Sequence, residues 1–84
     1  MIDLIFKKTP IEINQLIARQ IRFIRKEKKF SQEELSKRSG VSLGSVKRFE
    51  QTGEISLISL SKIAIVLGVS EQLETLFIQE NSDE

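Results

Sequence analysis

Closely spaced start and stop signals for short helices divide this 84-residue sequence. A Ser, Thr, Asp or Asn just before a helix accepts hydrogen bonds from its free N–H groups, and a Gly just after a helix supplies the left-handed residue that ends it. The first signal is TPIE, in which Thr9 stands before Pro10 and three residues before Glu12, as in a capping box. A chain divided in this way favours short helices joined by tight turns.

The first predicted helix starts near Pro10 and ends near Lys29. Apolar residues recur along it at helical spacing, and basic residues occupy a different face. The apolar residues are Ile13, Leu16, Ile17, Ile21 and Ile24, and the basic ones are Arg19, Arg22, Lys26 and Lys29. A basic amphipathic helix can also lie on a membrane, but the capped helices that follow this one favour packing in a core.

Two short helices are predicted next, and they meet across a tight turn. Ser31 stands three residues before Glu34, again as in a capping box, and Gly40 follows as a stop signal. The TGE run at residues 52–54 ends the second of the two. The predicted ranges are residues 32–39, capped by Ser31, and residues 43–51, capped by Ser42.

A fourth helix is predicted from about Ser56 to Gly68, and a fifth is predicted with Ser70 as its cap. In the fourth, the residues expected to point inward are Leu57, Leu60, Ile63, Ala64 and Leu67; the fifth carries Leu73, Leu76 and Phe77. The sequence therefore predicts a single all-α domain of five helices. Its predicted parts are residues 1–9, an extension that can form a short strand, residues 10–78, the helical domain, and residues 79–84, a flexible tail.

Composition disfavours an enzyme, a metalloprotein and a membrane protein. The chain has no Cys and no His, so it lacks disulfides, thiolate ligands and the commonest general base. No apolar run approaches the roughly 18 residues of a membrane span, and the N-terminus is unlike a secretory leader. Ser-Lys chemistry at residues 36–37 or 61–62 is disfavoured because neighbouring helical residues point about 100° apart. We therefore expect a cytoplasmic binding protein without metal, cofactor or membrane partner.

Charge is divided unevenly along the chain. Residues 1–50 carry 12 Lys or Arg against 6 Asp or Glu, a net +6, whereas residues 51–84 carry 1 against 6, a net −5. Chance segregation on a solvated surface is one explanation. The functional explanation is that the first half contacts a polyanion and the second half does not.

The third predicted helix has one apolar side and one small, cationic side. At about 100° per residue, Val46 and Phe49 fall on one side of it. The opposite side carries Gly44, Lys47, Arg48 and Gln51. Any one of these residues fits an ordinary solvated helix. The whole set, after a tight turn from another capped helix, is what a helix-turn-helix needs in order to enter a DNA major groove.

The residue types on that side suit contacts with bases. Arg48 can donate two hydrogen bonds to guanine O6 and N7, and Leu43 can pack on a thymine methyl group. Gly44 has no side chain, which lets the start of the helix approach the bases closely. The third helix is therefore predicted to read DNA sequence.

Residues 21–69 resemble the Cro/C1-type, or Xre, helix-turn-helix family, and the resemblance extends over about residues 13–77. It is carried by SQEEL, by SGVS, by the aromatic-Glu pair Phe49-Glu50 and by the Leu-rich fourth helix, each at the family's usual offset. The resemblance implies a five-helix, lambda-repressor-like DNA-binding domain.

The resemblance also implies roles for individual residues. The base contacts are Leu43, Gly44 and Arg48. The DNA backbone or auxiliary contacts are Ser31, Gln32, Ser42, Ser45 and Lys47, together with Arg22 of the basic stripe. Arg25 and Glu50 are expected to form an ion pair that braces the third helix against the first. Breaking such a pair costs about 3–5 kcal/mol if it is buried and under about 1 kcal/mol if it lies at the surface.

Three functions follow as predictions. The first is a sequence-specific transcriptional repressor that binds double-stranded DNA as a homodimer. The second is an antitoxin-type subunit, which autoregulates a toxin-antitoxin operon and binds a toxin or kinase-like partner, as small proteins resembling this one often do. The third is a degenerate helix-turn-helix that contacts only proteins. Leu43, Gly44 and Glu54 favour the third because they depart from the hydrogen-bonding and basic residues usual in the family.

Two apolar segments remain after the helical core is assembled, and both are candidates for a dimer or partner surface. They are Ile2, Leu4 and Phe6 before the first helix, and Leu76 and Phe77 in the fifth. The first segment can also pair as a strand with another sheet edge. The alternative is that these residues fold back onto the core.

Overall fold

The chain forms five helices and no strand within residues 7–79, which are the residues that the computed structural model describes. The helices are α2 (Pro10–Glu27), α3 (Gln32–Ser39), α4 (Leu43–Thr52), α5 (Leu57–Leu67) and α6 (Ser70–Glu74). The predicted all-α fold of five helices is confirmed. The strand predicted at Ile2, Leu4 and Phe6 lies outside the described residues, as do residues 80–84 of the predicted tail.

Side-chain caps begin four of the five helices, as the sequence predicts. At α2 the capping box is complete, because Glu12 N–H donates to Thr9 Oγ1 at 3.1 Å and Thr9 N–H donates to Glu12 Oε1 at 2.9 Å. The hydroxyls of Ser31, Ser42 and Ser56 accept in the same way at α3, α4 and α5. Each cap satisfies N–H groups that have no partner inside the helix.

The end of α2 differs from the prediction. The helix ends at Glu27, before the predicted end at Lys29. Lys29 adopts a left-handed conformation with φ of 63°, and the N–H of Phe30 donates to Arg25 O at 3.1 Å. The chain therefore turns sharply into α3, which a search for Gly or Asn stop signals does not detect.

The last helix also differs from the prediction. Ser70 is the first residue of α6 rather than its cap, and Val69 at the N-cap position offers no side-chain hydrogen bond. The helix ends at Glu74, so Leu76 and Phe77 lie beyond it instead of within it. Phe77 is left-handed, with φ of 66°, and 88% exposed.

The core forms where α2, α3, α4 and α5 meet. Its buried apolar side chains are Ala18, Ile21, Leu35, Val41, Val46, Phe49, Leu60, Ile63, Ala64 and Leu67. Leu57 was predicted to point inward but is 74% exposed, and Ile13 and Ile17 of the apolar stripe are also exposed. The apolar surface of α2 and α5 is thus wider than α3 and α4 cover.

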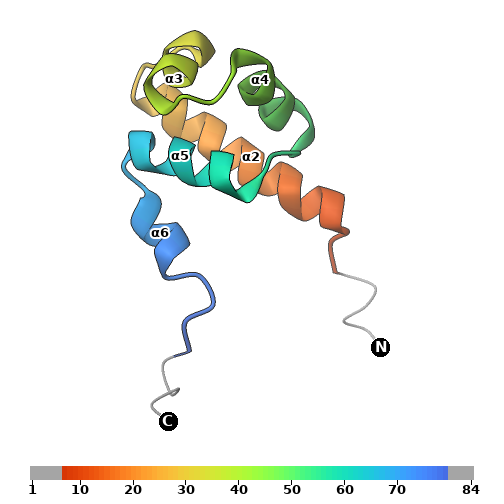
Figure 1. Cartoon of the computed structure of the whole chain (residues 1–84). Coiled ribbons are helices and arrows are strands. Elements are labelled where there is room, and N and C mark those ends of the chain that lie inside the picture. Colours follow the sequence, from red (N-terminus) through yellow and green to blue (C-terminus); the bar gives the residue numbers. More distant parts are fainter. Residues whose placement is uncertain (1–6, 80–84) are drawn as a thin grey trace.

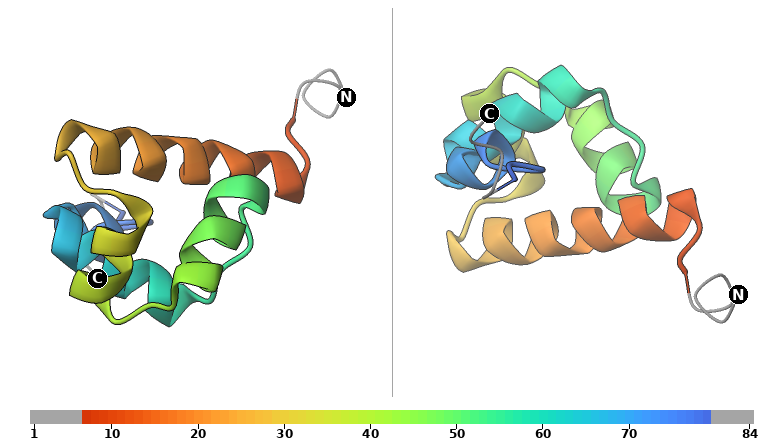
Figure 2. Two further views of the ribbon diagram at one scale, coloured as in Figure 1. Left: turned by 90° about the horizontal axis from the view of Figure 1, so that it is seen from above. Right: turned by 90° about the horizontal axis from the view of Figure 1, so that it is seen from below.

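The helices divide into two groups around α2. α3 and α4 lie on one side of α2 and α5, and α6 lies on the opposite side, packed against α5 (Figure 1). Figure 2 shows α2 as the longest element, with the shorter helices α3, α4 and α5 arranged beside it. α4 is therefore left open on the side that faces away from α6.

Candidate nucleic-acid interface

α4 has the orientation that the sequence predicts. Val46 is 0% exposed and Phe49 is 1% exposed, so both point into the core. Gly44, Lys47 and Arg48 are exposed on the other side. α4 packs against α2 and α3, and α6 packs against α5, so the C-terminal helix does not cover this cationic face.

The start of α4 is open and already hydrogen-bonded. A Cβ atom added to Gly44 would meet no atom within 4 Å, so packing within the protein does not require glycine there. The Ser42 hydroxyl accepts from Ser45 N–H at 3.1 Å and donates to Ser45 Oγ at 2.9 Å. Ser45 therefore keeps a hydroxyl hydrogen for an outside acceptor, whereas Ser42 is used as the cap. Leu43 is half-buried at the rim.

Arg25 and Glu50 form a buried ion pair between α2 and α4. Arg25 Nε donates to Glu50 Oε2 at 2.7 Å and Arg25 Nη2 donates to Glu50 Oε1 at 3.0 Å. The two side chains are 8% and 3% exposed, so the buried alternative holds. Arg25 Nη1 also donates to the Phe30 carbonyl at 2.7 Å, which ties the pair to the turn before α3.

Gln32, at the start of α3, joins this pair. Its Nε2 atom donates to Glu50 Oε1 at 2.9 Å. An amide nitrogen carries a second N–H, which remains for an acceptor such as a phosphate oxygen. Arg22 lies at the edge of the cluster, with Nε 3.9 Å from Glu50 Oε1 and a side chain 53% exposed. The buried cluster thus places Gln32 and Arg22 next to α4.

Arg48, the predicted base-reading residue, is held by a residue that the sequence prediction treated only as a departure from the family. Arg48 Nε and Nη2 both donate to Glu54 Oε1, at 2.9 and 2.6 Å. The side chains are 69% and 62% exposed. An exposed pair of this kind contributes about 0–1 kcal/mol to stability, so the pair adds little to folding.

The turn after α4 fixes the position of Glu54. Thr52 Oγ1 donates to Arg48 O at 2.8 Å and accepts from Glu54 N–H at 3.1 Å. Between them, Gly53 is left-handed with φ of 85°, and a Cβ atom there would lie 2.8 Å from the Asn14 backbone. Glu54 follows the glycine that ends the helix, a signal that marks the turn but does not show which side chain the turn brings beside Arg48.

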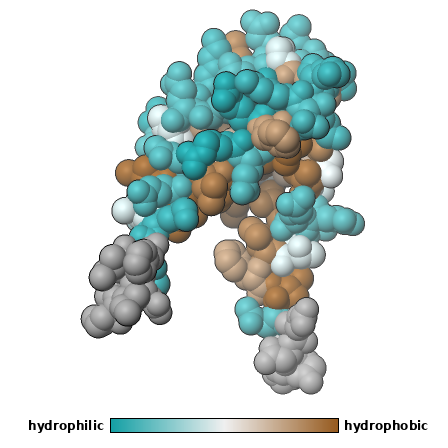
Figure 3. Space-filling model, turned by 180° about the vertical axis from the view of Figure 1, so that it is seen from behind, coloured by the Kyte–Doolittle hydropathy of each residue, from teal (hydrophilic) through white to brown (hydrophobic). Residues whose placement is uncertain are grey.

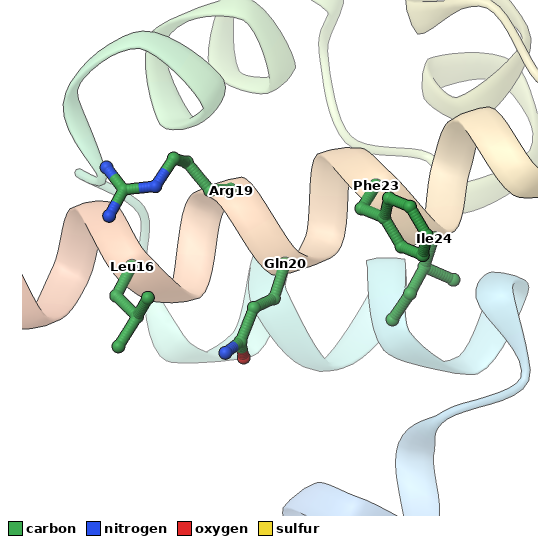
Figure 4. A pocket seen from close by; sticks show the side chains of 5 residues that line it. All are labelled: Leu16, Arg19, Gln20, Phe23 and Ile24. Carbon is green, nitrogen blue, oxygen red and sulfur yellow. The ribbon is translucent and has the colours of Figure 1, made fainter.

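Exposed arginines of α2 lie beside α4, and other exposed basic residues are spread over the domain. Arg19 is exposed on α2 and extends toward the side of α4 (Figure 4). The hollow drawn in that view is lined only by α2 residues, namely Leu16, Arg19, Gln20, Phe23 and Ile24. It is a shallow depression on the surface of one helix, too open to surround a ligand. Besides Arg19, Arg22, Lys47 and Arg48, the exposed basic residues among residues 7–79 are Lys7, Lys8, Lys26, Lys28, Lys29, Lys37, Arg38 and Lys62.

An apolar groove opens on the face of the domain away from α3 and α4. It has a volume of about 400 Å³ and is lined mainly by α2, α5 and α6, including Ile17, Leu57 and Leu73, with Leu76 beyond α6 and with Phe49 and Gly53 at the end of α4. Figure 3 shows brown side chains gathered in this hollow, between the two ends of the described chain. Phe77, 88% exposed, stands beyond α6. Leu76 and Phe77 belong to the predicted partner surface and are both exposed; Ile2, Leu4 and Phe6, the other residues of that prediction, lie outside the described residues.

Within residues 7–79, no helix is long and apolar enough to cross a membrane. The same residues contain no cluster of acidic side chains suited to a metal ion. The exposed cationic face of α4 and the apolar groove are therefore the candidate binding surfaces of the described residues.

The comparisons with known proteins agree with the geometry of α3 and α4. A family model described as helix-turn-helix matches residues 21–73, which include both helices and the Arg25–Glu50 pair. Comparisons with curated proteins and with solved structures gave no match.

Proposed function

Because the chain belongs to the Cro/C1-type (Xre) helix-turn-helix family of DNA-binding regulators, we propose that it is a sequence-specific repressor, which binds its operator as a dimer and excludes polymerase by occupancy. The observation that carries the proposal is the open face of α4, with Gly44, Lys47 and Arg48 exposed opposite the buried Val46 and Phe49. Such a face can enter the major groove without rearrangement of the fold.

The proposed contacts follow from where the donors lie. Arg48 reads a guanine, Leu43 packs on a thymine methyl, and Gly44 lets the helix approach. DNA phosphates next to the contacted bases accept hydrogen bonds from Gln32, through the N–H that Glu50 leaves free. They also accept from hydroxyl or charged donors near Gln32. These donors are Arg22, Ser31, Ser45 and Lys47, with Ser42 as an auxiliary residue that caps α4.

The apolar groove supports dimer formation. Monomeric proteins rarely expose large apolar patches, so such a patch usually marks a surface that binds a partner. Here a concave groove and a protruding Phe77 lie in neighbouring parts of one surface, which suits a two-fold interface in which each copy inserts its side chain into the other. Two copies would then present two α4 helices to half-sites about 34 Å apart.

The test of DNA reading is to select bound sequences from a random duplex pool and then titrate the selected duplex. We expect tighter binding to it than to random duplex, and a steep fall of log affinity with log salt. Arg48→Ala should reduce this preference, whereas Lys62→Ala, a matched loss of an exposed cation on α5, should leave the preference intact. Equal affinity for both duplexes at every salt concentration would contradict the repressor proposal.

The test of the dimer is sedimentation of the full chain. Leu76→Asp should give monomers, and Ile58→Asp, on an exposed α5 position outside the groove, should not. A wild-type chain that stays monomeric at high concentration and on the selected duplex would contradict the dimer.

The same groove gives the antitoxin function its support, since an apolar groove accepts a partner protein as readily as a second copy. In that case, co-expression with the product of the adjoining gene would yield a complex of fixed stoichiometry that Leu76→Asp disrupts. A complex unaffected by Leu76→Asp would count against this second candidate.

A further inference from the structure

We propose that Glu54 is a specificity-determining residue, which holds Arg48 in the orientation that reads guanine and disfavours contacts of Arg48 with phosphate. This inference rests on the proposed function, because it concerns how α4 discriminates between sequences. Glu54 does not contact the base in this account. It acts through Arg48 and is a positioning residue.

The first support is which edge of the guanidinium Glu54 occupies. Its Oε1 atom accepts from Nε at 2.9 Å and from Nη2 at 2.6 Å, so it lies on the side edge of the planar group. The terminal edge, formed by Nη1 and Nη2, keeps a pair of outward N–H groups. This is the edge whose parallel donors match guanine O6 and N7. Glu54 thus uses the donors that a bidentate base contact does not need.

The second support is that Glu54 is itself held in place. The Thr52 hydroxyl joins the Arg48 carbonyl, at 2.8 Å, to the Glu54 N–H, at 3.1 Å. Gly53 makes the left-handed turn between them, where a larger residue would collide with the backbone of Asn14. The carboxylate is therefore carried by a fixed turn anchored to α2. Because the fixed carboxylate already restricts the Arg48 side chain in the free protein, Arg48 loses less conformational entropy when it binds a base.

The third support is charge. An unpaired Arg48 would attract any phosphate and so would strengthen binding to every sequence. With Glu54 beside it, the local charge is neutral, and a phosphate near Arg48 is also near a carboxylate. Guanine O6 and N7 are neutral acceptors and suffer less from that repulsion. The pair therefore lowers binding to random DNA more than binding to a site with guanine opposite Arg48.

The experiment compares Glu54→Gln with the wild-type chain on three duplexes: the selected one, the selected one with the guanine opposite Arg48 replaced, and a random one. We expect Glu54→Gln to bind random duplex about threefold more tightly, a change of the size that one exposed charge supplies. Its discrimination for guanine at that position should fall by about tenfold, within the range that one bidentate contact supplies. Glu71→Gln, an equal change of charge on exposed α6, should leave the discrimination unchanged.

A second pair of variants separates positioning from charge. Thr52→Val removes both hydroxyl contacts and leaves the charge intact, so it should also lower the discrimination for guanine. Thr52→Ser keeps the hydroxyl and should discriminate as the wild-type chain does. In the Arg48→Ala background, Glu54→Gln should raise binding to all three duplexes by one common factor. NMR of the free protein should show the Arg48 Nε–H signal moved by Glu54→Gln and by Thr52→Val.

The outcomes are distinguishable. If the wild-type chain fails to discriminate among the duplexes, the proposed function is overturned, and the role of Glu54 with it. If it discriminates, but Glu54→Gln strengthens binding to all three duplexes equally, then Glu54 is only a repelling charge and this inference alone is overturned. The inference is also overturned if Glu54→Gln loses discrimination for guanine while Arg48→Ala keeps it, because Glu54 would then not act through Arg48.

Discussion

Replacing Arg25 with Met is expected to remove a large part of the stability of the domain. Met keeps much of the length of the side chain and removes the charge. The Glu50 carboxylate, 3% exposed, would lose both Arg25 hydrogen bonds and keep the one from Gln32, while the Phe30 carbonyl would lose its Arg25 donor. Removing one partner of a buried pair costs about 3–5 kcal/mol because a charge remains buried.

That cost is large against the total. Single domains have free energies of unfolding of about 0.05–0.15 kcal/mol per residue, or roughly 4–12 kcal/mol for a chain of this size. Urea unfolding followed by circular dichroism at 222 nm measures the loss directly, provided the slope with urea stays constant. By heat, each kcal/mol should lower Tm by about 4–8 °C.

The control is Arg22→Met, because Arg22 is 53% exposed and its Nε lies 3.9 Å from Glu50. It should cost under about 1 kcal/mol. The double replacement of Arg25 by Met and Glu50 by Leu should be more stable than Arg25→Met alone, since no buried charge is left. If Arg25→Met costs no more than Arg22→Met, or if the double variant is less stable than Arg25→Met, the burial argument is wrong.

Two further variants test the turns and caps of the helices. Gly53→Ala should destabilise by about 1–3 kcal/mol more than Gly40→Ala in urea unfolding, because both residues are left-handed but only at Gly53 would a Cβ meet backbone, 2.8 Å away at Asn14; equal losses would mean that the backbone there moves freely. Ser42→Ala should cost about 1 kcal/mol through the lost cap of α4, and no measurable loss would show that the exposed end of α4 does not need it.

Local signals in the sequence were sufficient to predict the starts of four of the five helices in residues 7–79. Capping by Thr9, Ser31, Ser42 and Ser56 depends on residues at most three positions apart, so the pattern can be recognised without knowing the fold. The same holds for the inward side of α4, since Val46 and Phe49 define it by helical spacing. At α6 the same kind of signal misled, because Ser70 is the first helical residue and not the cap, and both the cap and the end of this helix were predicted wrongly.

What the sequence could not supply is the partner of each exposed side chain. Leu57 follows helical spacing but faces the open groove, because α6 and its following residues cover α5 only in part. Glu54 was predicted only as an acidic departure from the basic residues usual in the family. Its sequence distance from Arg48 does not by itself place the two side chains on one helix face. The left-handed turn at Gly53 brings them together. Contacts made across a turn depend on its geometry, which residue types alone do not determine.

Two carboxylates make ion pairs at α4, one buried and one exposed. Because their burial differs, replacing each should have a different effect on stability and on DNA binding. Glu50, 3% exposed, links Arg25 and Gln32, so its replacement should disturb the packing of α4 on α2 and α3 and lower stability and DNA binding together. Glu54, 62% exposed, holds only Arg48 and lies in water, where the pair adds little to stability. Glu54→Gln should therefore change sequence preference while the free energy of unfolding in urea stays within about 0.5 kcal/mol of the wild-type value. If Glu54→Gln lowered the free energy of unfolding as much as Glu50→Gln, the Arg48–Glu54 pair would stabilise the fold. The division of roles, with Glu50 stabilising the position of α4 and Glu54 affecting base recognition, would then be wrong.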